Sequence, residues 1–188
     1  MSTTPASSTS DPTRSSDIET LKGLIRDVQD FPSEGILFRD ITPLLADARG
    51  LALAVGLMAA PYRDQTIDVV VGAESRGFIF GTAIAHELGV GFTPIRKPGK
   101  LPGDVVTQEY ELEYGKDALQ IHADAIKPGQ RVLIVDDLVA TGGTLVACRD
   151  LVRALGADIV GITVLIELVD LDGGALLAPD TLDSVLKY

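Results

Sequence analysis

Cysteine is nearly absent from this sequence. One cysteine, Cys148, stands among 188 residues, with two histidines and no tryptophan. A single cysteine cannot form an internal disulfide or a cysteine-based zinc site, so neither an oxidising compartment nor a metal scaffold is indicated, and we expect a cytoplasmic protein. No apolar run approaches the ~20 residues of a membrane span, and the N-terminus lacks a basic stretch followed by an apolar one. The sequence therefore predicts neither secretion nor membrane attachment.

Positive charge is also scarce. Sixteen Lys and Arg stand against 27 Asp and Glu, which leaves a formal net charge of −11. This charge repels a phosphate backbone, so general binding of nucleic acid is excluded unless the few cations gather in one place. With 46% apolar residues the chain can bury a real core, and its length fits one α/β domain.

The first 16 residues are mostly small and polar, and we expect them to form a flexible tail before a single domain over residues 17–188. Ser16 to Glu19 gives a capping-box pattern, and the apolar spacing that follows predicts a helix from Asp17 to about Val28. A second helix is expected from Asp47 to about Ala60.

Strand and helix patterns alternate along the rest of the chain. A mainly parallel sheet with helices on both faces is the expected result. The segment Arg96 to Val106 is rich in Pro and Gly and predicts an irregular loop. The expected strands are Ile67–Val71, Phe92–Ile95, Arg131–Val135 (central) and Ile159–Ile166, with Ala118–His122 pairing part of Thr107–Tyr114; the expected helices are Gly77–Leu88 and Thr144–Leu155.

The most informative segment runs from Val132 to Thr144. An apolar strand delivers Asp136 and Asp137 at its carboxyl end, where open α/β sheets bind their ligands. The following Thr-Gly-Gly-Thr opens a helix, and its glycines, free amides and hydroxyls suit a phosphate monoester. Carboxylates beside it suit sugar hydroxyls or Mg²⁺. Together they predict a site for a ribose 5-phosphate, although the same pattern also fits two aspartates that merely cap a helix after a glycine turn.

Two other phosphate-binding loops are excluded by inspection. Residues 72–77 have the glycine spacing of a P-loop, but Phe78 and Ile79 stand where Lys and Ser or Thr are required. Residues 89–91 lack the third glycine and the acidic partner of a dinucleotide fingerprint. An NAD enzyme is therefore not expected.

Several motifs in register over residues 18 to 188 carry a family resemblance. Residues 132–144 resemble the phosphoribosyl pyrophosphate (PRPP) motif of type I phosphoribosyltransferases. Phe31–Pro43, Glu74–Phe78, Ile95–Gly103 and Leu112–Gly115 resemble the branch of that family that acts on adenine. The resemblance implies the type I phosphoribosyltransferase fold, an α/β fold with a mainly parallel twisted sheet flanked by helices, a small hood subregion and a flexible active-site loop.

The reaction implied by the resemblance is transfer of the 5-phosphoribosyl group from PRPP to N9 of adenine, which gives AMP and pyrophosphate with Mg²⁺ and serves purine salvage. We expect the metal to be bound mainly through PRPP and water, because Mg²⁺ prefers oxygen ligands and keeps several waters. A homodimer is also implied.

The family match also assigns roles to residues. Turn chemistry at Lys100–Asp104 and the need to shield PRPP from water indicate that Arg96–Tyr114 closes as a lid. The match itself implies that the Glu74–Ser75 bond is cis. Alternatives stay open for these residues. Any one of the Arg and Lys residues named below can be solvated surface charge, and Phe38 and Leu168 can be ordinary core. Glu113 can be an exposed strand residue that alternates with Glu109 and Glu111. His86 and His122 are expected to be structural. The implied roles are catalysis for Glu113 and Tyr114; ribose and 5′-phosphate binding for Asp136, Asp137, Ala140, Thr141, Gly142, Gly143 and Thr144; pyrophosphate binding for Ser75, Arg76, Arg96, Lys97 and Lys100; and adenine binding for Leu37, Phe38, Arg39 and Leu168.

Two other functions remain compatible with the motifs. A phosphoribosyltransferase for xanthine, hypoxanthine or orotate shares the PRPP site, because base specificity depends on backbone contacts that a sequence does not show. A non-catalytic PRPP-binding regulator would need a DNA-binding module, for which this acidic chain has no room.

Overall fold

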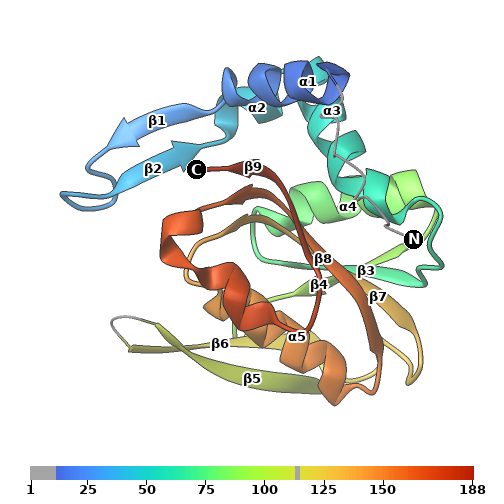
Figure 1. The fold of residues 1–188 in the computed structure, drawn as a ribbon. Coiled ribbons are helices and arrows are strands. Elements are labelled where there is room, and N and C mark those ends of the chain that lie inside the picture. The colour runs from blue at the N-terminus through green and yellow to red at the C-terminus, as the bar shows by residue number, and fades with distance from the viewer. Residues whose placement is uncertain (1–11, 113–114) are drawn as a thin grey trace, which may run out of the picture. The chain divides into compact units, whose positions relative to one another are not determined.

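The structure, a computed structural model, describes residues 12–112 and 115–188 (Figure 1). The chain divides into two compact units, one ending at Ala54 and one from Val55 to Tyr188. The boundary falls within helix α3 (Ala48–Ala59). The predicted catalytic residues Glu113 and Tyr114 lie outside the described residues.

The first unit contains helix α1 (Pro12–Lys22), strands β1 (Arg26–Gln29) and β2 (Leu37–Asp40), and the short helix α2 (Thr42–Ala46). Strands β1 and β2 pair antiparallel, with Val28 opposite Phe38. The predicted helix from Asp17 to Val28 is wrong at both ends, because α1 begins at Pro12 and the chain turns after Lys22. Leu24 and Val28 fit a helical period, yet the turn at Gly23 and the pairing with β2 determine the local structure.

The second unit is built on a five-stranded parallel sheet with the order β4-β3-β7-β8-β9 (Figure 1). Strand β7 lies at its centre and pairs with β3 and β8. The four sheet strands that the sequence predicted are confirmed within a few residues, whereas β9 was missed because Asp183 and Ser184 interrupt its apolar pattern. The strand bounds are β3 (Val69–Ala73), β4 (Gly91–Ile95), β7 (Arg131–Val139), β8 (Asp158–Glu167) and β9 (Leu182–Lys187).

Helices cover both faces of this sheet, as the sequence predicted. Helix α4 (Gly77–Leu88) packs against β3, β4 and β7, and α5 (Gly143–Ala154) packs on the opposite face (Figure 1). Alternate residues of β7 face the two layers, which explains why the strand is apolar throughout. Within the described ranges, no helix is long and apolar enough to cross a membrane.

Strands β5 (Val105–Leu112) and β6 (Gly115–His122) form a separate antiparallel pair. Leu119 and Ile121 on one face of this hairpin are buried in the same core as α5. An antiparallel bridge between Arg96 and Gln120 ties the loop after β4 to β6. The predicted pairing of residues 118–122 with 107–114 is thus confirmed, and much of the expected lid segment is strand.

Short 3-10 helices complete the unit: Ala60–Tyr62 after α3, and Val169–Leu171 and Gly173–Leu177 after β8. Tyr62 is 1% exposed, and its hydroxyl donates to Asp183 Oδ2 at 2.7 Å. Its ring lies over Gly161, where an added Cβ would stand 2.5 Å from the tyrosine oxygen and 2.7 Å from a ring carbon. The β7–β8 register shifts next to this glycine, so β8 makes room for the ring.

We expect Gly161→Ala to destabilise the protein by about 1–3 kcal/mol, because the new methyl group must displace a fully buried tyrosine ring. Gly91→Ala is the matched control, since Gly91 is also a strand residue but an added Cβ there meets no heavy atom within 4 Å. Urea unfolding monitored by circular dichroism measures the stability of both variants. Equal midpoints for the two variants would contradict the packing described.

Candidate active site

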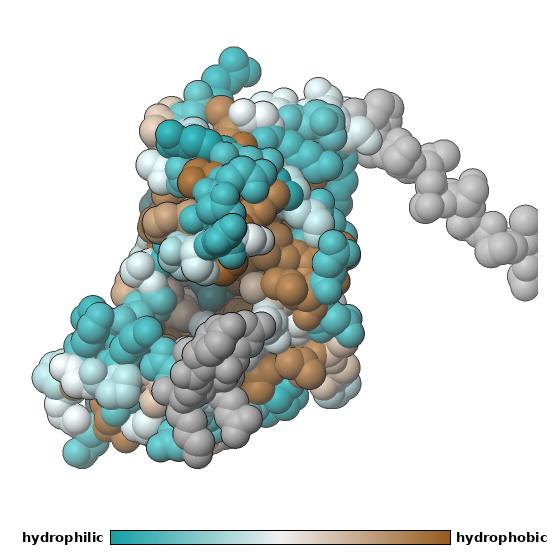
Figure 2. Space-filling model, turned by 90° about the vertical axis from the view of Figure 1, so that its left-hand side faces the viewer, coloured by the Kyte–Doolittle hydropathy of each residue, from teal (hydrophilic) through white to brown (hydrophobic). Residues whose placement is uncertain are grey.

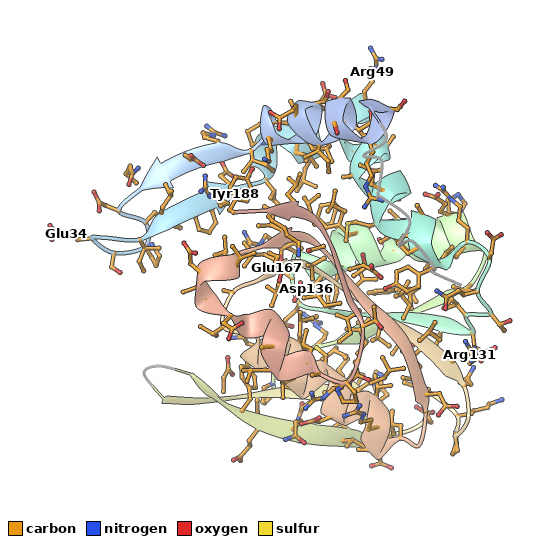
Figure 3. All side chains as sticks on the ribbon, in the orientation of Figure 1. Glu34, Arg49, Arg131, Asp136, Glu167 and Tyr188 are labelled. Carbon is orange, nitrogen blue, oxygen red and sulfur yellow. The ribbon has the colours of Figure 1, made fainter. Side chains whose placement is uncertain are left out.

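The carboxyl ends of the parallel strands surround a cavity of about 250 Å³. Figure 3 shows Asp136 well along β7 from Arg131, which begins the strand. The cavity lies where open α/β sheets bind ligands. Its walls are formed by Glu74–Arg76 after β3 and by residues 136–145, from the end of β7 into α5.

A tight turn at Thr141 to Gly143 leads from β7 into α5. Gly142 has φ +85°, and an added Cβ would stand 2.4 Å from the carbonyl oxygen of Gly173. The backbone of the 3-10 helix after β8 therefore presses on the turn, and only glycine fits between them. The first-turn amides of α5 have no acceptor within the helix, so they can bind an anion in the cavity.

Two carboxylates form the floor of the cavity. Asp136 is 7% exposed and Asp137 is 5% exposed, and the Asp137 amide donates to Asp136 Oδ1 at 2.9 Å. Asp137 Oδ2 lies 2.8 Å from Arg76 Nε as an ion pair, yet within the described residues no donor hydrogen is directed at this buried oxygen. A ligand hydroxyl or a metal-bound water can supply that missing hydrogen bond.

The environment of both carboxylates opposes ionisation. Burial raises the pKa of Asp136 well above its ordinary value, and the charge of Asp137 acts in the same direction. Burial also raises the pKa of Asp137, although Arg76 partly offsets this effect. Such perturbed carboxyl groups in a cavity are typical of functional sites.

The cationic side chains of the loop after β4, which belongs to the second unit, are each paired with a carboxylate. Arg96 Nε lies 3.0 Å and Lys100 Nζ 2.8 Å from Glu74, whose side chain is 8% exposed. Lys97 Nζ lies 2.8 Å from Asp117 Oδ2. Burial alone would raise the pKa of Glu74, but hydrogen bonds from Lys100, the Lys97 backbone and Arg96 together hold it below its ordinary value.

The structure brings together part of the predicted site. Ser75, Arg76, Asp136 and Asp137 line the cavity, as do the predicted phosphate-turn residues 140–144. The Glu74–Ser75 peptide bond is cis, as the resemblance implied.

The predicted adenine-binding residues lie in different units. Phe38 in β2 packs edge-to-face on Phe31 with ring centroids 5.1 Å apart, and Arg39 pairs with Asp27. Leu168 follows β8, and its amide donates to the Val139 carbonyl at 3.0 Å. Their roles, like those of Glu113 and Tyr114, stay predictions.

Sequence reasoning missed the roles of Glu74 and Asp117 as partners of the cations. Glu74 directly precedes two predicted residues, but its type suggested no anion-binding function. Asp117 gave no sequence signal, because its position opposite Tyr110 follows from the hairpin register. In the part of the chain that the structure describes, no group of three or more His, Cys, Asp or Glu side chains could hold a metal by itself.

Comparison with known proteins decides the family. Residues 43–185 match the phosphoribosyl transferase domain. The adenine phosphoribosyltransferase of Rhodopirellula baltica is 60% identical over 168 residues, which cover 89% of this chain and 82% of that protein. The chain belongs to the adenine phosphoribosyltransferases.

Solved structures of adenine phosphoribosyltransferases share the fold. The protein from Thermoanaerobacter pseudethanolicus superposes with a TM-score of 0.89 at 47% identity, covering 91% of this chain and 99% of that one. The protein from Saccharomyces cerevisiae, crystallised with an imino-altritol bisphosphate and adenine, gives a TM-score of 0.87 at 39% identity, with 92% and 99% covered. The predicted type I phosphoribosyltransferase fold is thereby confirmed.

We expect Asp136→Asn to stabilise the protein at pH 7.5. The raised pKa means that the folded state binds the Asp136 proton more tightly than the unfolded chain does, so ionisation destabilises the fold progressively above the ordinary value of 3.8. The asparagine avoids this penalty and can still accept the Asp137 amide. We therefore expect the free energy of unfolding to be higher for the variant at pH 7.5.

Urea unfolding at pH 7.5 and pH 5 measures this effect, and the gain is expected to shrink at the lower pH. Asp124→Asn, which removes a charge from an exposed residue, is the control. A gain that is absent at pH 7.5, or that grows toward pH 5, would contradict the assignment of a raised pKa.

Proposed function

We propose that the cavity at the end of β7 binds PRPP and that the chain transfers its 5-phosphoribosyl group to N9 of adenine, giving AMP and pyrophosphate. This is the reaction of the family to which the chain belongs. The observation that carries the proposal is the pair of buried carboxylates beside a glycine–threonine turn within one cavity. The relatives are named for adenine, which favours this reaction over another base and over a non-catalytic regulator.

The turn and the carboxylates would hold the two ends of the ribose 5-phosphate. Amides and hydroxyls from Ala140 to Thr144 suit the 5′-phosphate, because they combine hydrogen-bond donors at the wall of the cavity with the positive end of the α5 dipole. Asp136 and Asp137 suit the ribose 2′ and 3′ hydroxyls, which can donate to carboxylate oxygens such as Asp137 Oδ2.

Cations would stabilise the departing pyrophosphate. As the bond from C1 to pyrophosphate lengthens, the ribose gains oxocarbenium character and negative charge gathers on the leaving group, so catalysis requires positioning and electrostatic stabilisation. Arg76 lines the cavity together with Ser75, and Arg96, Lys97 and Lys100 belong to the loop after β4. The electron-poor ring would be stabilised by the carboxylates of Asp136 and Asp137.

Leu37, Phe38 and Arg39 in the first unit, and Leu168 in the second, are the residues that the family resemblance assigns to adenine. A flat base lies well against apolar side chains while backbone groups contact its polar edge. Glu113 would donate a proton or hydrogen bond to N7 as bond formation makes that nitrogen more basic, and Tyr114 would pack beside it. Adenine in the Saccharomyces cerevisiae crystal supports this ligand class.

Magnesium is part of the proposal. The buried Asp137 Oδ2 beside Arg76 and the oxygen-rich cavity fit an ion that keeps most of its waters, while no complete protein-only ligand group exists within the described residues. When bound through PRPP, Mg²⁺ would neutralise part of the pyrophosphate charge.

Three further expectations accompany the reaction. We propose a homodimer, a cytoplasmic location and closure of the Arg96–Tyr114 segment over the substrate to exclude water. Large apolar side chains at Val169, Leu171 and Leu176 are 43–58% exposed, which is compatible with a subunit contact. The face shown in Figure 2 likewise has hydrophobic residues at the surface among hydrophilic ones.

Purified protein incubated with adenine, PRPP and Mg²⁺ should produce AMP and pyrophosphate. Hypoxanthine and guanine should react at least about 100-fold more slowly, because the base site is expected to match the 6-amino group. Excess EDTA should abolish the reaction, and added Mg²⁺ should restore it. Chromatography of the nucleotide products measures all three. Equal rates with guanine would refute the adenine assignment, and full activity in EDTA would refute the metal requirement.

Glu113→Gln should lower kcat by about 10²- to 10⁴-fold, the usual range for loss of a general acid. The KM for PRPP should change by less than about 3-fold, because the glutamine removes the proton but not the binding residues for the sugar phosphate. Glu109→Gln, an exposed position on the preceding strand, is the control and should stay within about 2-fold of the parent protein. A normal kcat in Glu113→Gln would exclude the proposed role.

A further inference from the structure

Asp117 is a carboxylate that the proposed reaction does not use. It lies on β6 directly opposite Tyr110 of β5, at the end of the hairpin face whose other residues include the buried Leu119 and Ile121. Its Oδ2 atom is 2.8 Å from Lys97 Nζ and 3.3 Å from the Tyr110 hydroxyl. Its Oδ1 atom accepts the Ala118 amide at 2.8 Å. Both oxygens are thus held in place.

Asp117 lies between the two segments that would bind the ends of PRPP. On one side, Tyr110 belongs to β5, which packs against α5, the helix that follows the phosphate turn. On the other side, Lys97 belongs to the loop after β4, whose Arg96 and Lys100 pair with Glu74. The carboxylate of Asp117 therefore contacts this loop, while the Tyr110 hydroxyl holds that carboxylate in position.

Two effects of Asp117 on an incoming anion oppose each other. The carboxylate orders the Lys97 side chain, which favours binding, but it also places a negative charge beside the cation that the anion must reach. Lys97 is 51% exposed, so ordering an ion pair at this position is worth little. A fixed charge a few ångströms from a bound multivalent anion changes its affinity by about 3- to 10-fold or more, so repulsion is the larger effect.

We propose that Asp117 is a built-in counter-anion for Lys97: it competes with pyrophosphate for the lysine ammonium and thereby weakens pyrophosphate binding and speeds its release. The inference rests on the proposed pyrophosphate role of Lys97. Because the Ala118 amide and Tyr110 hold the carboxylate, it stays beside the lysine when the anion arrives. Asp117 is thus a residue that tunes product affinity rather than one that binds substrate.

Asp117→Asn tests the proposal because it removes the charge and keeps the shape. Calorimetry measures the Kd of inorganic pyrophosphate with Mg²⁺, on enzyme saturated with ribose 5-phosphate so that no reaction occurs. We expect the Kd to fall about 3- to 10-fold at low salt, and by less than 2-fold at 0.5 M salt, where screening is strong. The Kd of ribose 5-phosphate should stay within 2-fold. A gain in affinity cannot arise from a damaged fold.

Control variants isolate the charge pair. Asp124→Asn removes an exposed carboxylate beyond β6 and should leave the pyrophosphate Kd unchanged. In a Lys97→Gln background, Asp117→Asn should strengthen pyrophosphate binding less than in the parent protein, because only the direct repulsion of the anion is then removed and no lysine is freed. If Asp117→Asn does not fold, Asp117→Ser removes the same charge and is held to the same expected result.

The outcomes separate this inference from the proposed function. Unchanged or weaker pyrophosphate binding by Asp117→Asn, with normal binding of ribose 5-phosphate, would overturn the counter-anion role. An equal gain in the Lys97→Gln background would also overturn it. If the parent protein binds neither ribose 5-phosphate nor pyrophosphate, the proposed function itself fails.

Discussion

The site depends on the burial of two adjacent carboxylates at the end of the central strand. Apolar residues on both faces of β7 place it between two helix layers, and Asp136 and Asp137 lie within its last four residues, buried at the wall of the cavity. Burial opposes their ionisation, and Arg76 is the cation that offsets it for Asp137. The fold therefore accepts two buried carboxyl groups whose ionisation is unfavourable, and in the proposed reaction their oxygens would contact the ribose.

The cations near the cavity are also balanced by carboxylates. Cations that suit a pyrophosphate group are scarce in this acidic chain, and those of the loop after β4 lie against Glu74 and Asp117. Internal carboxylates prevent a cluster of like charges from repelling itself in the absence of ligand. In the proposed reaction, pyrophosphate would therefore meet cations that already have carboxylate partners.

Sequence patterns predicted the parallel sheet well because β3, β7 and β8 are short apolar runs bounded by turn residues, a pattern that local chemistry determines. The bounds of α1 and the existence of β9 were not predictable in this way, since a turn at Gly23 and pairing with β8 override the local periodicity. The Asp-Asp and Thr-Gly-Gly-Thr motif marked the cavity correctly. Asp117 escaped notice because its importance comes from hairpin register and from Lys97, which are separated from it along the chain.

The contact between Gly142 and Gly173 links the phosphate turn to a segment 31 residues further along the chain. Backbone lies directly on backbone there, so the turn acquires its final shape only when the segment after β8 has docked. During synthesis the ribosome must therefore release nearly the whole domain before the anion-binding loop is complete. The segment after β8, which is synthesised later, thus fixes the backbone conformation of the turn between β7 and α5, which is synthesised earlier.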